Sequence, residues 1–385
     1  MISLVNFVKF SSILISSRKI SLSKQSDEVT KIITNSGYKA EVHKVKTIDD
    51  YELTVHQILP QQIIDRKKCV FFMHGLFRNS ADFLATGSQI ALPYLLADHG
   101  FDVFLGNARG TKYSTKNFKY DNKSKEFWNF SWEEIGLYDL PPMFNFSLEK
   151  SETEKINYVG HSQGCTAALV LLSENPEWNS KFTQLHLLTP AVFLHHAKSP
   201  AYKIGIRLQN FLTRLHKIDI GMLLRFGNQM QKFSKNNPKT ILDLYKQITC
   251  KIVGTNKGEI QLSLEVLKLL SDFMSPTVSA NQLRHFLQLY ESGKFQKFDY
   301  KTRNILKYGS NEPPEFELKN IKVSTYLYHA EMDALVDTKS VEQLAQILPN
   351  VKKLTVVPDY NHLDVMLGKN CRKDLYENML KDLIE

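Results

Sequence analysis

The chain has little cysteine and no long apolar run. Only four of its 385 residues are cysteines, too few for a disulfide scaffold in a chain of this size. Two of them, Cys69 and Cys165, lie in apolar stretches, which predicts buried thiols. The chain has no C-x-x-C motif, so we expect no metal site. No run approaches the roughly 20 apolar residues that a transmembrane helix needs.

What the chain does have is the composition of a folded globular protein. Hydrophobic residues make up 43% and charged residues 23%, and no repeat or low-complexity tract interrupts them. A chain of this length is long for one plain domain, so we expect one domain with a sizeable insertion.

The net charge of +9 is concentrated in one segment. Between Ala201 and Lys251 there are ten basic residues and two acidic ones, and aliphatic residues recur among them at helical spacing. Basic amphipathic helices suit an anionic lipid surface, and a solvated helical face is the alternative. Because no nucleic-acid-binding motif accompanies the charges, we expect no nucleic-acid partner.

Strand-like and helix-like segments alternate along most of the chain, which indicates an α/β fold with a mainly parallel sheet. The expected strands span residues 42–46, 51–58, 69–73, 102–105, 156–159, 184–188, 323–328 and 354–357. Helical patterns lie at 89–98, 166–173 and 340–348. The alternation stops after Pro190 and resumes near Pro314. We therefore expect a core of residues 29–190 and 315–385, with a largely helical cap at 191–314 over the carboxyl ends of the strands.

A G-x-S-x-G motif at Gly160–Gly164 stands between an expected strand and an expected helix. In that context the motif predicts a nucleophile elbow, which exposes the hydroxyl of Ser162 to a histidine base. The flanking glycines leave room for the strained turn.

The sequence also predicts the two other members of a catalytic triad. Asp333 and His362 each follow an apolar strand-like run, and the order Ser162, Asp333, His362 is that of α/β hydrolases. Asp364, two residues beyond His362, is the rival carboxylate, but Asp333 fits the order better. Such a triad needs no cofactor.

Acyl transfer also needs donors for the oxyanion of the tetrahedral intermediate. The backbone amide of Gln163 is one candidate, and the other should come from the loop 74–77 after the third strand. Asn107 and Arg109 are interpreted as bracing a loop below the site, and Trp128 and Trp132 as packing residues.

The first 28 residues are a candidate signal or anchor segment. Residues 1–20 are apolar and basic without acids, yet Lys9 and Arg18 interrupt what would be a signal-peptide core. The triplets that begin at Asn122, Asn129 and Asn145 are glycosylation acceptors if the chain enters the secretory route.

Taken together, several motifs resemble the acid lipase family of gastric and lysosomal lipases. They are the segments 73–76, 105–110, 127–132, 138–141, 160–164 and 360–364. The resemblance implies an α/β-hydrolase fold, Ser162 as nucleophile, Asp333 as acid, His362 as base, and Leu76 and Gln163 as oxyanion donors. The cap matches the family poorly except around residues 198–200 and 295–300.

The sequence therefore predicts a serine carboxylic ester hydrolase that acts on neutral lipid esters, either triacylglycerols or sterol esters. A small-ester esterase or acyltransferase on the same fold, and a lipid carrier without catalysis, are the alternatives. The resemblance implies a secreted or lysosomal protein, and an intracellular, lipid-associated protein is the alternative.

Overall fold

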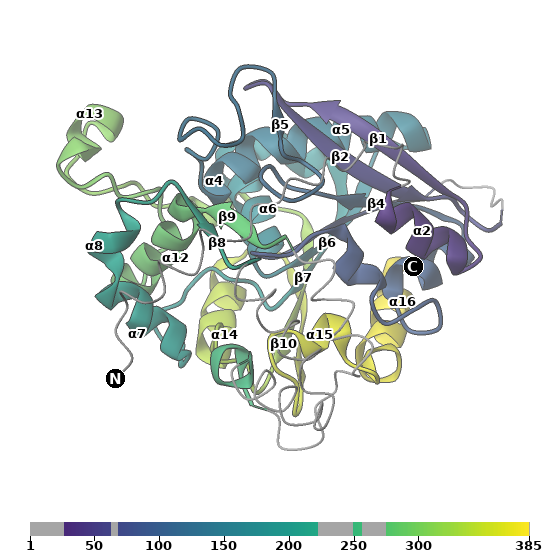
Figure 1. Ribbon diagram of the computed structural model, residues 1–385. Helices are drawn as coiled ribbons and strands as arrows, with labels where there is room; N and C mark the ends of the chain where they lie inside the picture. The colour runs from purple at the N-terminus through teal and green to yellow at the C-terminus, as the bar shows by residue number, and fades with distance from the viewer. Residues whose placement is uncertain (1–26, 63–67, 222–248, 256–274, 385) are drawn as a thin grey trace, which may run out of the picture.

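The computed structural model describes residues 27–62, 68–221, 249–255 and 275–384. Most of the predicted signal or anchor segment, and residues 222–248 of the basic segment, lie outside these ranges. Figure 1 shows a central sheet with helices packed around it, and α7, α8, α12 and α13 gathered at one side.

The sheet is mainly parallel, as the alternation predicted. Its order is β1-β2-β4-β3-β6-β7-β10-β11, with β5 paired to the end of β2. The pairs from β4 to β11 are parallel, and β1–β2 and β2–β4 are antiparallel. The strands are β1 Ala40–Lys46, β2 Tyr51–Ile58, β3 Lys68–Met73, β4 Phe101–Gly106, β5 Lys116–Asn117, β6 Ile156–His161, β7 Phe182–Leu188, β10 Ser324–Ala330 and β11 Val351–Val357. All eight predicted strands are confirmed.

Helices cover both faces of the sheet, because the side chains of a buried strand alternate between two apolar layers. In β3, Phe71 packs into one core with α5, α6 and α14, whereas Val70 and Phe72 pack into the other with α2, α3 and α16. The core helices are α2 Glu28–Asn35, α3 Leu92–Asp98, α4 Trp132–Glu134, α5 Leu140–Ser151, α6 Gln163–Glu174, α14 Thr338–Ile347, α15 Asp364–Leu367 and α16 Glu377–Ile384. The three predicted helices correspond to α3, α6 and α14.

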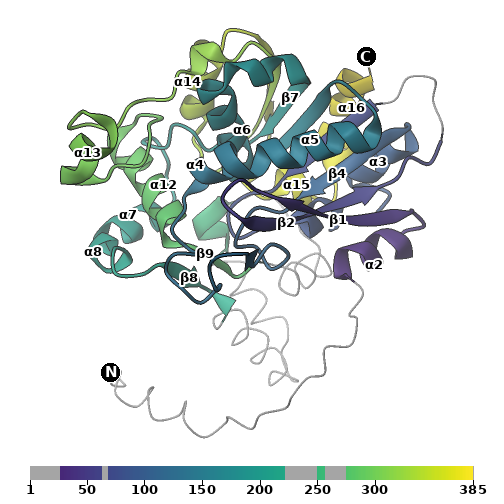
Figure 2. The ribbon, with the colours of Figure 1, turned by 90° about the horizontal axis from the view of Figure 1, so that it is seen from above.

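The interval between β7 and β10 has, in its described residues, no strand in the main sheet. Its described elements are α7 Pro200–Arg207, α8 Gln209–Leu212, β8 Lys217–Asp219, β9 Thr277–Ser279, α12 Ala280–Ser292 and α13 Asn304–Tyr308. The antiparallel pair of β8 with β9 was not predicted, because its strands are three residues long and lie about 60 residues apart in sequence. Figure 2 shows α7, α8, α12 and α13 at the left of the molecule, with β8 and β9 between them and β2.

Candidate active site

Ser162 lies in a strained turn between β6 and α6. Its backbone angles are φ 52° and ψ −115°, a left-handed conformation that a serine rarely adopts. Glycine is required on both sides of it. A Cβ on Gly160 would lie 2.9 Å from the nitrogen of Cys165, and one on Gly164 would lie 2.2 Å from the oxygen of Met73. The turn predicted from the motif is present, and the Ser162 side chain is partly exposed at it.

The two other predicted triad residues are in contact. The Nδ1 atom of His362 lies 2.6 Å from Oδ2 of Asp333, and both side chains are buried. The second carboxylate oxygen of Asp333 accepts the backbone N–H groups of Leu335 at 2.8 Å and Val336 at 3.0 Å. These bonds fix the carboxylate so that one oxygen stays directed at the imidazole.

The rival carboxylate, Asp364, has a different task. Its Oδ2 accepts the backbone N–H of Asn361 over 2.9 Å, so it holds the turn in which His362 lies. Asp333 is therefore the carboxylate that the structure brings to the imidazole.

The loop after β3 lies directly against Ser162. A Cβ on Gly75 would lie 3.1 Å from the Cβ of Ser162, a tight contact, so glycine at residue 75 favours this close approach of the loop. His74 holds the loop from behind: its Nδ1 donates to the Gly75 carbonyl at 2.8 Å, and its Nε2 accepts the Ala108 N–H at 3.1 Å. Burial lowers the pKa of His74 to about 4, which keeps this bridge neutral. Leu76, a predicted oxyanion donor, is the next residue.

Three contacts to the site were not predicted from the sequence. The Nε2 atom of His161 donates to the carbonyl of His362 over 2.9 Å, and burial lowers the pKa of His161 well below its usual value. On α12, the side chain of Gln282 donates to that of Gln163 over 3.0 Å. Val253 accepts backbone N–H groups from the two triad loops. Only His161 had a signal in the sequence, since it lies within the elbow motif.

A small hollow lies beside Gly75 and Gln163. One wall consists of core residues that include His74, Arg78 and Ala108. Other lining residues come from the interval between β7 and β10: Ser275, Thr277, Val278 and Gln282. The predicted oxyanion loop therefore faces residues of the predicted cap.

Asn107 and Arg109 tie neighbouring loops together, as their predicted bracing role requires, and Arg109 also lines the hollow beside Gly75 and Gln163. Arg109 is buried, and its Nε donates to Asp139 at 2.8 Å while its Nη2 donates to Asp49 at 2.8 Å. Asn107 accepts the Ser80 N–H at 3.1 Å and donates to the Thr54 carbonyl at 3.1 Å. Trp128 and Trp132 are buried, which confirms their predicted packing role. The thiols of Cys69 and Cys165 are buried as predicted.

Other predictions concern the surface and metal chemistry. The three asparagines of the glycosylation triplets, Asn122, Asn129 and Asn145, are exposed. Within the described ranges, no three histidine, cysteine or acidic side chains gather as metal ligands would. Among the same described residues, no helix has the length and apolarity to cross a bilayer.

A parallel sheet of this order, with a serine elbow after β6 and an Asp–His pair after β10 and β11, defines the class of α/β hydrolases. The family model of the alpha/beta hydrolase fold matches residues 68–369, and that of the partial alpha/beta-hydrolase lipase region matches residues 29–87.

Curated relatives place the chain more narrowly. It is 37% identical to Lipase 3 of Drosophila melanogaster over 91% of each chain. It is 31% identical to the gastric triacylglycerol lipase of Rattus norvegicus, over 93% of this chain and 91% of the relative. Among solved structures, a putative lipase from Sulfolobus solfataricus has a TM-score of 0.61 at 18% identity and covers 89% of this chain and 93% of its own. That likeness bears on the fold alone.

The chain thus belongs to the α/β-hydrolase lipase family that includes the gastric lipases, which confirms the resemblance read from its motifs. It is a carboxylic ester hydrolase.

Proposed function

We propose that the protein hydrolyses neutral lipid esters, triacylglycerols or sterol esters, through an acyl-enzyme on Ser162. The observation that carries this proposal is the 2.6 Å contact between His362 and Asp333, together with the strained elbow that presents Ser162 beside the loop 74–77. The relative named as a gastric triacylglycerol lipase supports the choice of substrate.

In this mechanism Nε2 of His362 takes the proton of the Ser162 hydroxyl while Oγ attacks the ester carbonyl. Asp333 holds Nδ1 protonated and stabilises the imidazolium that forms. The backbone amides of Leu76 and Gln163 donate to the oxyanion. The tetrahedral intermediate expels the alcohol, which takes the proton from His362. Water then attacks the acyl-serine by the same route and releases the fatty acid.

The proposal is tested with emulsified triolein and cholesteryl oleate, from acidic to mildly alkaline pH. We expect the wild-type protein to release fatty acid from at least one emulsion. Ser162→Ala should lose nearly all turnover while keeping its fold, because the nucleophile is gone. Ser180→Ala, which removes an exposed hydroxyl elsewhere, is the matched control.

Retained activity in folded Ser162→Ala protein would refute the nucleophile assignment. Preference for short soluble esters, with no gain on the emulsions, would favour the esterase alternative. Lipid binding without any turnover would favour the carrier.

The predicted cap also offers a surface for lipid. Ile204, Leu208 and Phe211 recur at helical spacing along α7 and α8 and are 53%, 49% and 56% exposed. Basic residues accompany them at Lys203, Arg207 and Arg214. An apolar stripe flanked by cations fits a surface that contains anionic lipid. We propose that this face of the cap contacts the substrate particle peripherally, which agrees with a secreted or lysosomal lipase.

Flotation with vesicles of phosphatidylcholine and phosphatidylserine tests the contact. We expect Phe211→Ser to reduce the vesicle-bound fraction several-fold, because a half-exposed aromatic ring is lost from the apolar stripe. Phe118→Ser removes an equally exposed ring, 53% exposed, from the core loop after β5, and should leave binding unchanged. Equal losses in the two variants would contradict the proposed surface.

A further inference from the structure

A second cavity, of about 340 Å³, lies apart from the catalytic residues. Four segments line it: residues 125–129, 213–216 and 298–303, and the half-buried side of α12 at Asn281 and Arg284. None of Ser162, Asp333, His362, Leu76 or Gln163 lines it. Since Gln282, which contacts Gln163, is only two positions from Arg284, α12 directs these two side chains in different directions.

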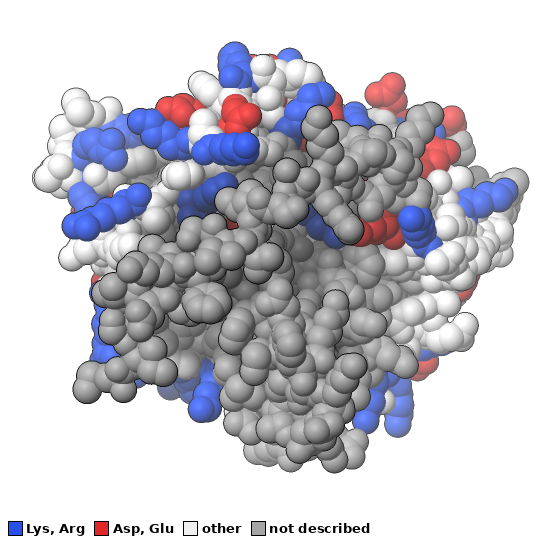
Figure 3. Space-filling model, in the orientation of Figure 1, with Lys and Arg blue, Asp and Glu red and all other residues white. Residues whose placement is uncertain are grey.

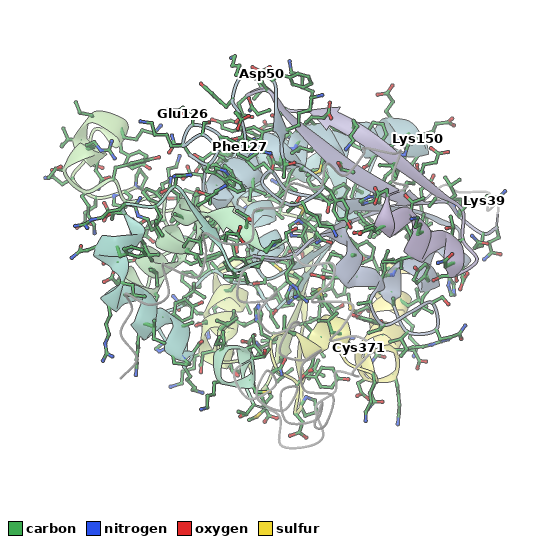
Figure 4. The ribbon with its side chains drawn as sticks, in the orientation of Figure 1. Lys39, Asp50, Glu126, Phe127, Lys150 and Cys371 are labelled. Carbon is green, nitrogen blue, oxygen red and sulfur yellow. The ribbon has the colours of Figure 1, made fainter. Side chains whose placement is uncertain are left out.

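Positive charge dominates the lining. Lys125, Arg284 and Arg303 contribute three cations, against the single carboxylate of Glu126. In Figure 3, Lys and Arg side chains predominate at the upper left, around α13, and Figure 4 labels Glu126 on the loop beside this region. Glu126 forms a long ion contact with its neighbour Lys125, at 3.9 Å.

The two arginines have no carboxylate partner within the described part of the chain. Nη1 of Arg284 donates to the side chain of Asn281 at 2.9 Å, and no described acidic side chain comes within 4.0 Å of its guanidinium. Arg284 is half-buried, and burial together with the like charge of Arg303 lowers its pKa. An anion between the guanidinium groups would oppose both effects, because its charge stabilises the protonated guanidinium groups.

Three aromatic rings, those of Trp128, Phe298 and Tyr300, also line the cavity, and two of them contact the guanidinium groups. Arg284 lies over the ring of Phe298, 5.1 Å from its centroid, and Arg303 lies 5.7 Å from the ring centroid of Tyr300. Phe298 and Trp128 are buried. A guanidinium stacked on a ring loses little freedom when it binds an oxyanion, because its planar fork of N–H donors is already oriented.

We propose that this cavity binds the oxyanion of an anionic amphiphile, a carboxylate or phosphate that carries an apolar chain. The arginines would hold the oxyanion by charge-assisted hydrogen bonds, and the rings of Trp128, Phe298 and Tyr300 would contact the first carbons of the chain. The site is separate from Ser162 and does not depend on the proposed hydrolysis.

Binding is measured by titration calorimetry below the micelle concentration, with decanoate, decyl phosphate, inorganic phosphate and decanol as probes. The test variant is Arg284→Gln with Arg303→Gln. The control is Lys155→Gln with Lys181→Gln, which removes two positive charges from exposed positions outside the cavity. Because the active site is unaltered in both variants, a difference between them reports on the cavity.

We expect decanoate or decyl phosphate to bind the wild-type protein, and the arginine variant to bind at least tenfold more weakly, because two charge-assisted contacts are lost. The control should stay within about twofold, since its charges are screened from the cavity. If decanoate binds more tightly than decyl phosphate, the oxyanion comes from a fatty acid. If decyl phosphate binds more tightly, the oxyanion comes from a phospholipid headgroup.

Equal affinities of the arginine variant and the wild-type protein would overturn the proposal. So would decanol binding as tightly as decanoate, or inorganic phosphate binding as tightly as decyl phosphate. If circular dichroism shows that the double variant does not fold, the single variant Arg303→Gln is tested instead, because Arg303 is exposed and its replacement should not affect folding. It should weaken binding at least threefold.

Discussion

The carbonyl oxygen of Val253 accepts the backbone N–H of His362 over 3.2 Å, and also that of Ala334 at 3.2 Å. Val253 belongs to the described stretch 249–255, between β7 and β10. A single peptide group from this interval thus holds the loop of Asp333 and the loop of His362 together. The catalytic pair depends on a segment far from it in sequence.

The neighbour of Val253 makes this arrangement testable. Gly254 has φ +115°, and a Cβ there would lie 1.9 Å from the carbonyl oxygen of Met332. Gly254→Ala should therefore push the stretch away from the Asp333 loop and lower kcat/KM at least tenfold, since small misplacements of catalytic groups are costly. Kinetics on a soluble ester would measure the loss.

Gly37→Ala is the matched control for that experiment. Gly37 has φ +91°, and a Cβ added there would have nothing within 4 Å, so its alanine variant carries backbone strain without the clash. It should cost about 1 kcal/mol of stability and no activity. If Gly254→Ala behaved like Gly37→Ala, the stretch 249–255 would have no part in positioning the pair.

Asp333→Asn should lower kcat by a factor of ~10³–10⁴, because an amide next to Nδ1 no longer selects the imidazole tautomer that can accept the serine proton. The substitution keeps the shape of the side chain, so KM should change little. Steady-state kinetics would separate the two parameters.

Asp364→Asn tests the rival carboxylate in the same assay. Its carboxylate accepts a backbone N–H of the His362 turn, so the loss in kcat should be far smaller than for Asp333→Asn. A larger loss from Asp364→Asn, in protein of unchanged melting temperature, would make Asp364 the triad acid.

Glu133 should make the stability of the fold depend on pH. Burial, and then the neighbouring Glu134, raise the pKa of Glu133 from 4.5 to about 7, while Lys297 opposes the shift. The folded state therefore prefers the protonated carboxyl, and this contribution to stability is present below pH ~4.5 and lost as pH rises to about 7. The shift corresponds to roughly 3 kcal/mol.

Glu133→Gln removes that titration. Relative to the wild-type protein, its free energy of unfolding should rise by up to about 3 kcal/mol between pH 5 and pH 8, as measured by urea denaturation. Glu149→Gln, at an exposed position, should show no such trend. A pH-independent difference between Glu133→Gln and wild type would contradict the assignment.

Much of the fold could be predicted because its signals are local. Runs such as 69–73 and 156–159 indicate strands by their apolar composition, and Gly160 and Gly164 are needed within the turn that they flank. The predicted pair of Asp333 and His362 follows from the same logic, since residues that end neighbouring parallel strands meet at one edge of the sheet.

The predictions were incomplete where contacts join distant segments. Gln282 meets Gln163 across 119 positions, and Val253 meets His362 across more than 100, with no local pattern at either end. The sequence likewise contains no sign that Arg284 and Arg303 line one cavity, because α12 and the loop 298–303 come together only through packing.

The sequence by itself determined the strand order in the chain, the elbow at Ser162 and the choice of Asp333 and His362, since each depends on residue type and short-range spacing. Only the tertiary structure decided that Asp364 holds the turn of His362, how the interval between β7 and β10 holds the triad loops, and where Arg284 and Arg303 come together. Those outcomes depend on close packing between segments that are far apart in the sequence and that no sequence pattern links.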